Sequence, residues 1–195
     1  MQSKLLKILI IPFVFAAMFV GAQDNPFQLI LEPVDFPEVG GLQVFAHAQY
    51  DGKWLILGGR LDGLHRRQPW AAFDAEGKNN QIIVIDPENK QKWSAPLSSL
   101  STNLQEQLSS TNMQFQQEGE MLYFIGGYGY SNTAKDHITY GNLTAIDVPA
   151  TISAVINGTS FVENFRQISD PQFAVTGGYL LKVYDTFYLV GGNKF

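Results

Sequence analysis

The sequence predicts an all-β fold built from a repeated hairpin. Three apolar runs of strand length each end in two glycines: Gly58 and Gly59, Gly126 and Gly127, and Gly191 and Gly192. The pairs lie 68 and 65 residues apart, and this regular spacing indicates an internal repeat. With 45% hydrophobic and 16% charged residues among 195, the chain is long and apolar enough to fold around a core.

A hairpin is predicted before each glycine pair. The second strands are the apolar runs themselves, at residues 54–57, 122–125 and 188–190. Turn signals precede them at residues 50–53, 117–120 and 183–186, and first strands are predicted at residues 44–48, 113–115 and 173–175. Each unit therefore begins as two antiparallel strands that end in glycines.

Further strands follow in the first two units. Residues 81–86 form an apolar run that ends in Asp86, and Trp93 opens a predicted fourth strand. In the second unit, the run at residues 143–147 ends in Asp147 and is the corresponding third strand. Fully apolar strands are typical of sheets covered on both faces. Two short helices are also predicted, at residues 98–109 and 150–156.

The first 22 residues have the composition of a secretory signal peptide. Lys4 and Lys7 precede an uncharged apolar stretch at residues 8–20, which ends in the small residues Gly21 and Ala22. The stretch is shorter than the roughly 20 apolar residues that span a bilayer, so a membrane anchor is the weaker interpretation. We expect a secreted or periplasmic protein without disulfides, of a type common among exported bacterial proteins.

The order of these features resembles the kelch repeat, which forms one four-stranded blade of a β-propeller, as in the central domain of galactose oxidase. The first unit matches through Gly58, Gly59, Asp86 and Trp93, but Ile85 stands where the family usually has tyrosine. The second unit keeps Gly126, Gly127 and Asp147 and has no matching tryptophan; Phe161 or Phe165 is expected to pack in its place. The third unit keeps Gly191 and Gly192.

The resemblance implies a partial kelch-type propeller of about two and a half blades. The blades would span residues 42–111, 112–171 and, incompletely, 172–195, after a signal peptide at 1–22 and an N-terminal segment at 23–41. Propellers close with about 4–8 blades, so we expect this chain to be the N-terminal part of a longer propeller. Further blades or another subunit would close the ring, with residues 27–31 as a candidate closing strand.

Two long connections carry the candidate ligand-binding residues. The connection after the first glycine pair holds His65 together with Arg60, Arg66 and Arg67, and the guanidinium groups of the three arginines suit carboxylates or phosphates. The alternative is that these arginines pair with acidic residues and hold the loop in place. The connection after the second pair holds Tyr128, Tyr130 and His137, which suit stacking on a sugar or a peptide, or simply packing at a blade edge.

Other function classes are disfavoured. The net charge of −5 argues against a nucleic-acid-binding surface. The chain has no cysteine and its three histidines lack metal-ligand spacing, so neither a metal nor a cofactor is predicted. The leading hypothesis is an exported binding module that presents long loops to a protein or carbohydrate partner. The alternative is an enzyme acting on acidic sugars, similar to a sialic-acid epimerase, with an arginine-lined pocket.

Overall fold

The computed structural model describes residues 27–34, 36, 38–63 and 73–195. The chain divides into two units, residues 1–33 and residues 34–195. In the first unit, the described residues 27–33 form neither helix nor strand, and the closing strand at residues 27–31 stays a prediction. The predicted signal peptide lies outside the described residues.

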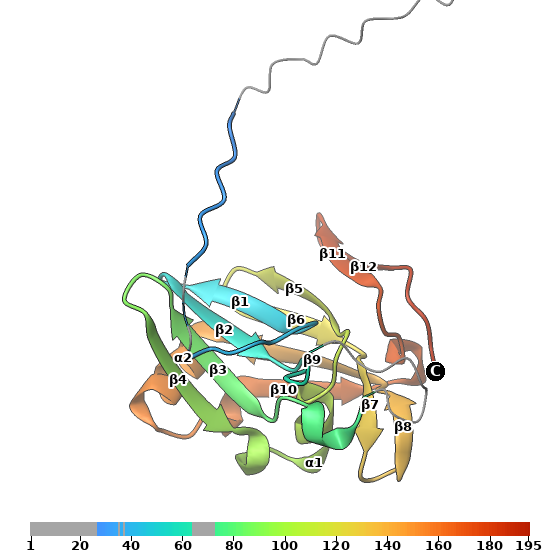
Figure 1. The fold of residues 1–195 in the computed structure, drawn as a ribbon. Coiled ribbons are helices and arrows are strands. Elements are labelled where there is room, and N and C mark those ends of the chain that lie inside the picture. The colour runs from blue at the N-terminus through green and yellow to red at the C-terminus, as the bar shows by residue number, and fades with distance from the viewer. Residues whose placement is uncertain (1–26, 35, 37, 64–72) are drawn as a thin grey trace, which may run out of the picture. The chain divides into compact units, whose positions relative to one another are not determined.

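The first sheet is a four-stranded antiparallel meander in the order β1-β2-β3-β4 (Figure 1). Its strands are β1 (Ala46–Tyr50), β2 (Lys53–Leu57), β3 (Gln81–Asp86) and β4 (Gln91–Pro96). Asp51 and Gly52 both have positive φ angles, 48° and 71°, which suits the tight turn between β1 and β2. The predicted third strand is confirmed at the same residues, and Trp93 does lie in a fourth strand.

The second sheet repeats this plan in the order β5-β6-β9-β10. Its strands are β5 (Gln114–Glu118), β6 (Met121–Ile125), β9 (Asn142–Asp147) and β10 (Phe165–Ser169). The predicted third strand at residues 143–147 is therefore confirmed. Between β6 and β9, a second hairpin of β7 (Tyr128–Ser131) and β8 (Asp136–Thr139) replaces the predicted loop.

The third unit is the hairpin of β11 (Tyr179–Val183) and β12 (Thr186–Val190). The first strand predicted at residues 173–175 is wrong. Asp170 accepts a hydrogen bond from the Gln172 main chain and starts a 3₁₀ turn over Pro171–Phe173, so the strand begins only after Gly177 and Gly178. The fold is therefore predominantly β, as predicted, with two four-stranded sheets and two hairpins in the described part.

Two α-helices accompany the sheets, α1 (Thr102–Leu108) and α2 (Val148–Asn157), and both predicted helices are confirmed with shifted ends. The Asp147 carboxylate caps α2 by accepting from the Ala150 main chain, and Gly158, with φ of 64°, ends it. Short 3₁₀ turns lie at Ala75–Gly77, Leu97–Ser99 and Val162–Asn164. Neither helix is long and apolar enough to cross a membrane, within the part of the chain that the structure describes.

The main core lies between the first two sheets. One face of the first sheet packs towards Leu122, Phe124 and Ile146 of the second sheet, and α2 contacts all four strands of the first sheet. That face is fully buried at Ala46, Ala48, Leu55, Leu57, Ile82 and Val84. Trp93 packs against the same core. Phe161 and Phe165 are buried in this core as well, and one of them was expected to pack where the second unit lacks a matching tryptophan.

The glycine pairs lie where successive units touch. The Gly59 main-chain N–H donates to the Ser110 carbonyl at 2.9 Å, and the Gly127 N–H donates to the Val175 carbonyl at 3.1 Å. A Cβ on Gly126 would lie 1.7 Å from the Val175 oxygen, which leaves no space for a side chain. Neighbouring backbones therefore approach closely at the first two glycine pairs, as the sequence analysis expects of them.

We predict that Gly126→Ala destabilises the protein by about 1–3 kcal/mol more than Gly191→Ala. Gly126 and Gly191 share a φ of +70°, so both alanines carry the same strain of a left-handed backbone, about 1–2 kcal/mol. Only the Gly126 variant adds a clash, because nothing lies within 4 Å of a Cβ at Gly191. Urea unfolding of both variants measures the difference, and equal losses would contradict the contact between units.

Candidate functional site

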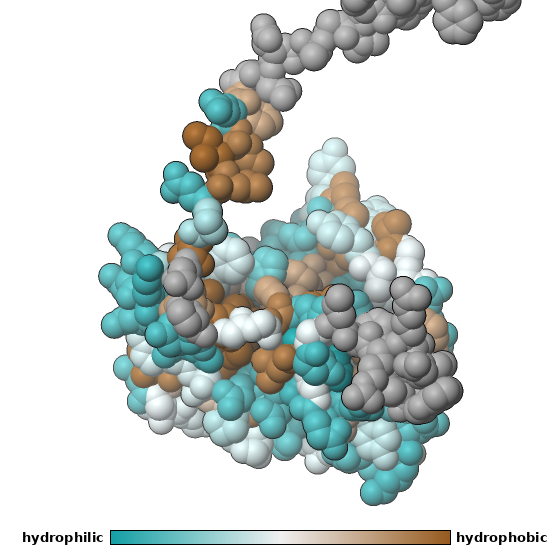
Figure 2. Space-filling model, viewed as in Figure 1, coloured by the Kyte–Doolittle hydropathy of each residue, from teal (hydrophilic) through white to brown (hydrophobic). Residues whose placement is uncertain are grey.

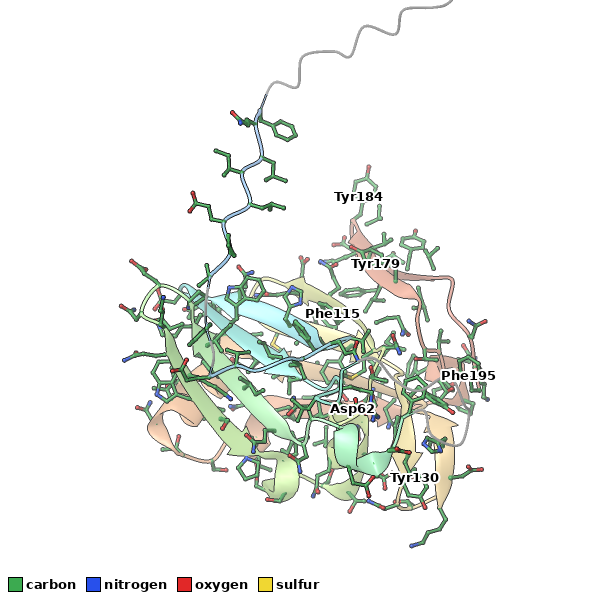
Figure 3. The ribbon with its side chains drawn as sticks, in the orientation of Figure 1. Asp62, Phe115, Tyr130, Tyr179, Tyr184 and Phe195 are labelled. Atoms are coloured by element: carbon green, nitrogen blue, oxygen red, sulfur yellow. The ribbon has the colours of Figure 1, made fainter. Side chains whose placement is uncertain are left out.

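The two connections singled out from the sequence come together on one side of the fold, which we call the loop face. Tyr128 stacks on His137 with ring centroids 5.9 Å apart, and it contacts Phe73 and Phe195 edge-on at 5.2 and 5.4 Å. The His137 Nε2 lies 3.1 Å from the Phe73 carbonyl oxygen. Figure 3 labels Tyr130, on β7, and Phe195 on this side of the protein. The structure thus brings Tyr128, Tyr130 and His137 together.

Arg60 belongs to the loop face but its guanidinium is already bound. The side chain is only 4% exposed. Its Nε donates to Asp62 at 2.8 Å, and a terminal nitrogen binds the other Asp62 oxygen and the Asp74 carbonyl. These contacts favour the alternative in which Arg60 holds its loop in place. The other predicted ligand-binding residues of this loop, His65, Arg66 and Arg67, lie outside the described residues.

Glu106, which the sequence did not single out, ties α1 to the β7–β8 hairpin. Its carboxylate accepts from the Ser131 hydroxyl at 2.7 Å and from the main chain and hydroxyl of Thr133, both at 2.9 Å. Burial alone would raise the pKa of the Glu106 carboxyl, but these hydrogen bonds outweigh it and lower the pKa below its ordinary value. Glu106 therefore stays ionised and fixes the hairpin.

The loop face is closed by its own side chains. Burial, with a smaller contribution from the Glu106 charge, raises the pKa of Tyr140, whose hydroxyl donates to the Tyr130 carbonyl at 3.1 Å. Burial and the nearby Asp136 also raise the pKa of Tyr128. The space left among these groups is about 10 Å³, room for no more than one water. The described part of the loop face is packed like a core rather than shaped for a ligand.

A larger cavity of about 440 Å³ lies where the first strands of the three units converge, and we call it the inner-strand cavity. β5 contacts β1 on one side and β11 on the other, so all three strands contribute to its walls. The surface is hollowed beside the β11–β12 hairpin (Figure 2), and Figure 3 places Phe115 and Tyr179 on neighbouring elements there. The lining residues are His47, Gln49, Met113, Gln114, Phe115, Gln116, Gln117, Gly178, Tyr179 and Leu180.

Among the described residues, the lining combines aromatic rings with amide side chains and carries no carboxylate, lysine or arginine. His47 stacks on Trp54 at 5.3 Å and meets Phe115 edge-on at 4.9 Å. Burial lowers the pKa of His47, so this ring is neutral at neutral pH. Amide groups donate and accept hydrogen bonds equally well, which makes the cavity polar but uncharged.

Some of these amides have structural roles. The Gln117 side chain accepts from the Gln49 main-chain N–H and donates to its carbonyl, both at 2.8 Å, and so joins β5 to β1. The Gln116 amide nitrogen donates to the Gln117 carbonyl at 2.9 Å. Within the described residues, the Gln116 Oε1 accepts no hydrogen bond, and the Gln49 side chain makes none. These two amides therefore offer polar groups to a ligand.

The sequence did not single out this cavity, although a signal was present. His47, Phe115 and Leu180 each stand eleven residues before the first glycine of their pair, so the repeat places them at equivalent positions. The run from Gln114 to Gln117 is also unusually rich in amides for a strand. Because the first strands of the three units lie side by side, these equivalent positions could have been recognised as parts of one site.

No protein-family model and no curated protein matches the chain. Among the described residues, no group of three histidine, aspartate or glutamate side chains is arranged to hold a metal ion. The function must therefore be inferred from the geometry of the chain's own residues, and the inner-strand cavity of about 440 Å³ is large enough for a small ligand.

We predict that Glu106→Gln costs about 1–3 kcal/mol of stability at pH 7 and progressively less as the pH falls. Because its folded-state pKa is lowered, the Glu106 carboxylate stabilises the protein above its unfolded pKa of about 4.3, and this contribution is lost as the pH falls through the folded pKa. Urea unfolding at several pH values measures the difference between variant and wild type.

Glu120→Gln is the matched control for this experiment, since the Glu120 side chain is exposed. We expect it to change stability by no more than about 0.5 kcal/mol at any of these pH values. A Glu106→Gln penalty that is the same at pH 7 and pH 3 would mean that the carboxylate charge does not hold the hairpin.

Proposed function

We propose that this protein is a binding module made of kelch-type propeller blades, and that its inner-strand cavity binds a neutral carbohydrate. Two four-stranded antiparallel meanders and a third hairpin support the blade assignment, and in each unit a glycine pair follows the second strand. Equivalent bridges at Gln43 to Arg60, Thr111 to Tyr128 and Thr176 to Asn193 follow the same register in all three units. In a propeller, the first strands of such units surround the central channel.

The observation that carries this proposal is the composition of the cavity wall. Sugar rings present apolar C–H faces that stack on aromatic rings, and hydroxyl groups that bond to amides. His47, Phe115 and Tyr179 supply rings, and Gln49 and Gln116 supply amides, around a volume of about 440 Å³. Ligand sites commonly combine such a concave, partly apolar wall with a few polar groups.

The preference for a neutral ligand follows from the charges. The described residues of the cavity wall include no arginine or lysine to balance a carboxylate, and His47 is neutral because burial lowers its pKa. The hypothesis of an enzyme for acidic sugars depended on Arg60, Arg66 and Arg67. Arg60 is bound to Asp62, and no observation in the described residues favours that hypothesis over the binding module. We retain export through a signal peptide at residues 1–22 as part of the proposal.

We predict that neutral oligosaccharides of glucose, galactose or N-acetylglucosamine change the tryptophan fluorescence of the protein, and that Gln116→Ala weakens their binding about 10-fold. Trp54 stacks on His47 at the cavity wall and should report its occupation. The loss of one hydrogen bond costs about 1.4 kcal/mol of binding free energy, which corresponds to a 10-fold weaker affinity. Titration calorimetry gives an independent affinity.

Tyr130→Ala is the control, because Tyr130 lies on the loop face and should leave the affinity unchanged. Sialic acid tests the alternative function directly. Binding that is lost in Tyr130→Ala and kept in Gln116→Ala would assign the site to the loop face. Turnover of sialic acid, or binding confined to acidic sugars, would overturn the proposal of a neutral ligand.

A further inference from the structure

His47 stands in the wall of the inner-strand cavity with unused hydrogen-bonding groups. Neither ring nitrogen makes a hydrogen bond to the described residues, although the ring lines the cavity. Among those residues, the enclosed side-chain polar atoms without a partner are the Ser110 Oγ and the Gln114 Oε1. The His47 nitrogens are therefore not enclosed, and they are open to a ligand.

Aromatic neighbours hold the His47 ring in place. Trp54 stacks on it with 23° between the ring planes and 5.3 Å between the centroids. Phe115, which Figure 3 labels, and Phe45 meet the ring edge-on, with centroids 4.9 and 6.1 Å away. A ring held in this way loses little conformational freedom when a ligand bonds to it.

The protonation state of the ring decides what it offers to a ligand. A neutral imidazole has one N–H donor and one bare nitrogen that accepts, whereas the imidazolium ion has two donors and no acceptor. Burial lowers the pKa of His47, and no charged neighbour contributes to this shift. His47 therefore presents an acceptor nitrogen at neutral pH.

The cavity holds no countercharge for a protonated His47. The elements that contact β1 are β2, β5, β6 and α2, and their titratable side chains are Lys53, Glu118 and Tyr123. Lys53 and Glu118 are each held in an ion pair of their own. Across the cavity, β11 presents Tyr179, and tyrosine side chains ordinarily titrate at about pH 10. Among the described residues, His47 is thus the group of this wall that can change its charge near neutral pH.

We propose that a hydroxyl of the bound carbohydrate donates to the acceptor nitrogen of His47, and that acidification therefore releases the carbohydrate from the inner-strand cavity. This inference rests on the proposed carbohydrate site and adds its regulation by pH. The protonated ring has no acceptor for the hydroxyl. A neutral ligand also displaces water from the ring without supplying a countercharge, so binding lowers the pKa of His47 further.

Thermodynamic linkage fixes the direction of the effect. Because the ligand lowers the pKa of His47, protonation of the ring must weaken binding by the same factor. Above the pKa of the ligand-free ring, the affinity is independent of pH. Below that pKa, the affinity falls by up to about 10-fold per pH unit.

Titration calorimetry of the full chain tests this release between about pH 7.5 and about pH 5, with neutral oligosaccharides of glucose, galactose or N-acetylglucosamine as ligands. Histidine is the side chain whose ordinary pKa, about 6.5, lies in this range. We expect the wild-type dissociation constant to rise at least about 3-fold at the lower pH. In His47→Gln, whose amide donates and accepts but does not titrate, the affinity should be the same at both pH values.

His137→Gln and His65→Gln are the matched controls, because these are the other histidines of the chain. Both variants should keep the pH dependence of the wild type, and the glutamine amide can still donate to the Phe73 carbonyl that His137 contacts. Circular dichroism checks that each variant is folded. An NMR titration of the wild-type His47 ring needs no variant, and saturating oligosaccharide should lower the pKa that it measures.

Failure of the acid release can be told apart from failure of the carbohydrate site. A wild-type protein that binds none of these oligosaccharides at about pH 7.5 would overturn both. Binding that is equally tight at the lower pH, or that stays pH-dependent in His47→Gln, would overturn the acid release alone. So would an NMR titration in which the ligand leaves the pKa of His47 unchanged or raises it.

Discussion

The arrangement of the units depends on a main-chain contact at the glycine pairs. Where Gly59 and Gly127 donate to Ser110 and Val175, one unit's strand end touches the backbone that leads into the next unit. A Cβ at Gly126 would push apart the two backbone segments that meet at Val175. The second sheet and the β11–β12 hairpin would then lose their face-to-face packing. The same contact sets the first strands side by side, because each begins a few residues beyond the point of approach. The inner-strand cavity is thus a consequence of how units are joined.

Although the units are joined by the same kind of contact, equivalent residues have different hydrogen-bonding roles in different units. Asp86 and Asp147 both end a third strand, but Asp86 accepts from the main chain and side chain of Asn89 and closes a tight turn, whereas Asp147 caps α2. Hydrogen bonds from Asn89 lower the pKa of Asp86, so the turn retains its charged acceptor. The turn returns β4 directly to the first sheet. The helix instead places Ile152 and Val155 over that sheet, where they add to the core.

The sequence predicted those parts of the fold in which local pattern and tertiary packing agree. Continuous apolar runs such as those of β3 and β6 are strands both by propensity and by burial, and the glycine pairs are conspicuous at any spacing. The hairpin of β7 and β8 was missed because its strands are short and rich in glycine and polar residues; it is held by Glu106 and by the stacking of Tyr128 on His137. Contacts between distant segments of this kind leave no periodicity in the sequence.

The sequence directed attention to the long connections rather than to the inner-strand cavity for a related reason. Long connections with arginine and tyrosine attract attention because loops carry many binding sites, but the same side chains can be used to pack the loop itself. Arg60, bound by Asp62 and the Asp74 carbonyl, has little capacity left for an anion. The inner strands differ from these loops, because their backbone is already paired within the sheets and Gln117 links β1 to β5 by two hydrogen bonds. Amides at neighbouring positions are then left to face the cavity. Polar groups that the fold does not need for its own stability are the ones most available to a ligand.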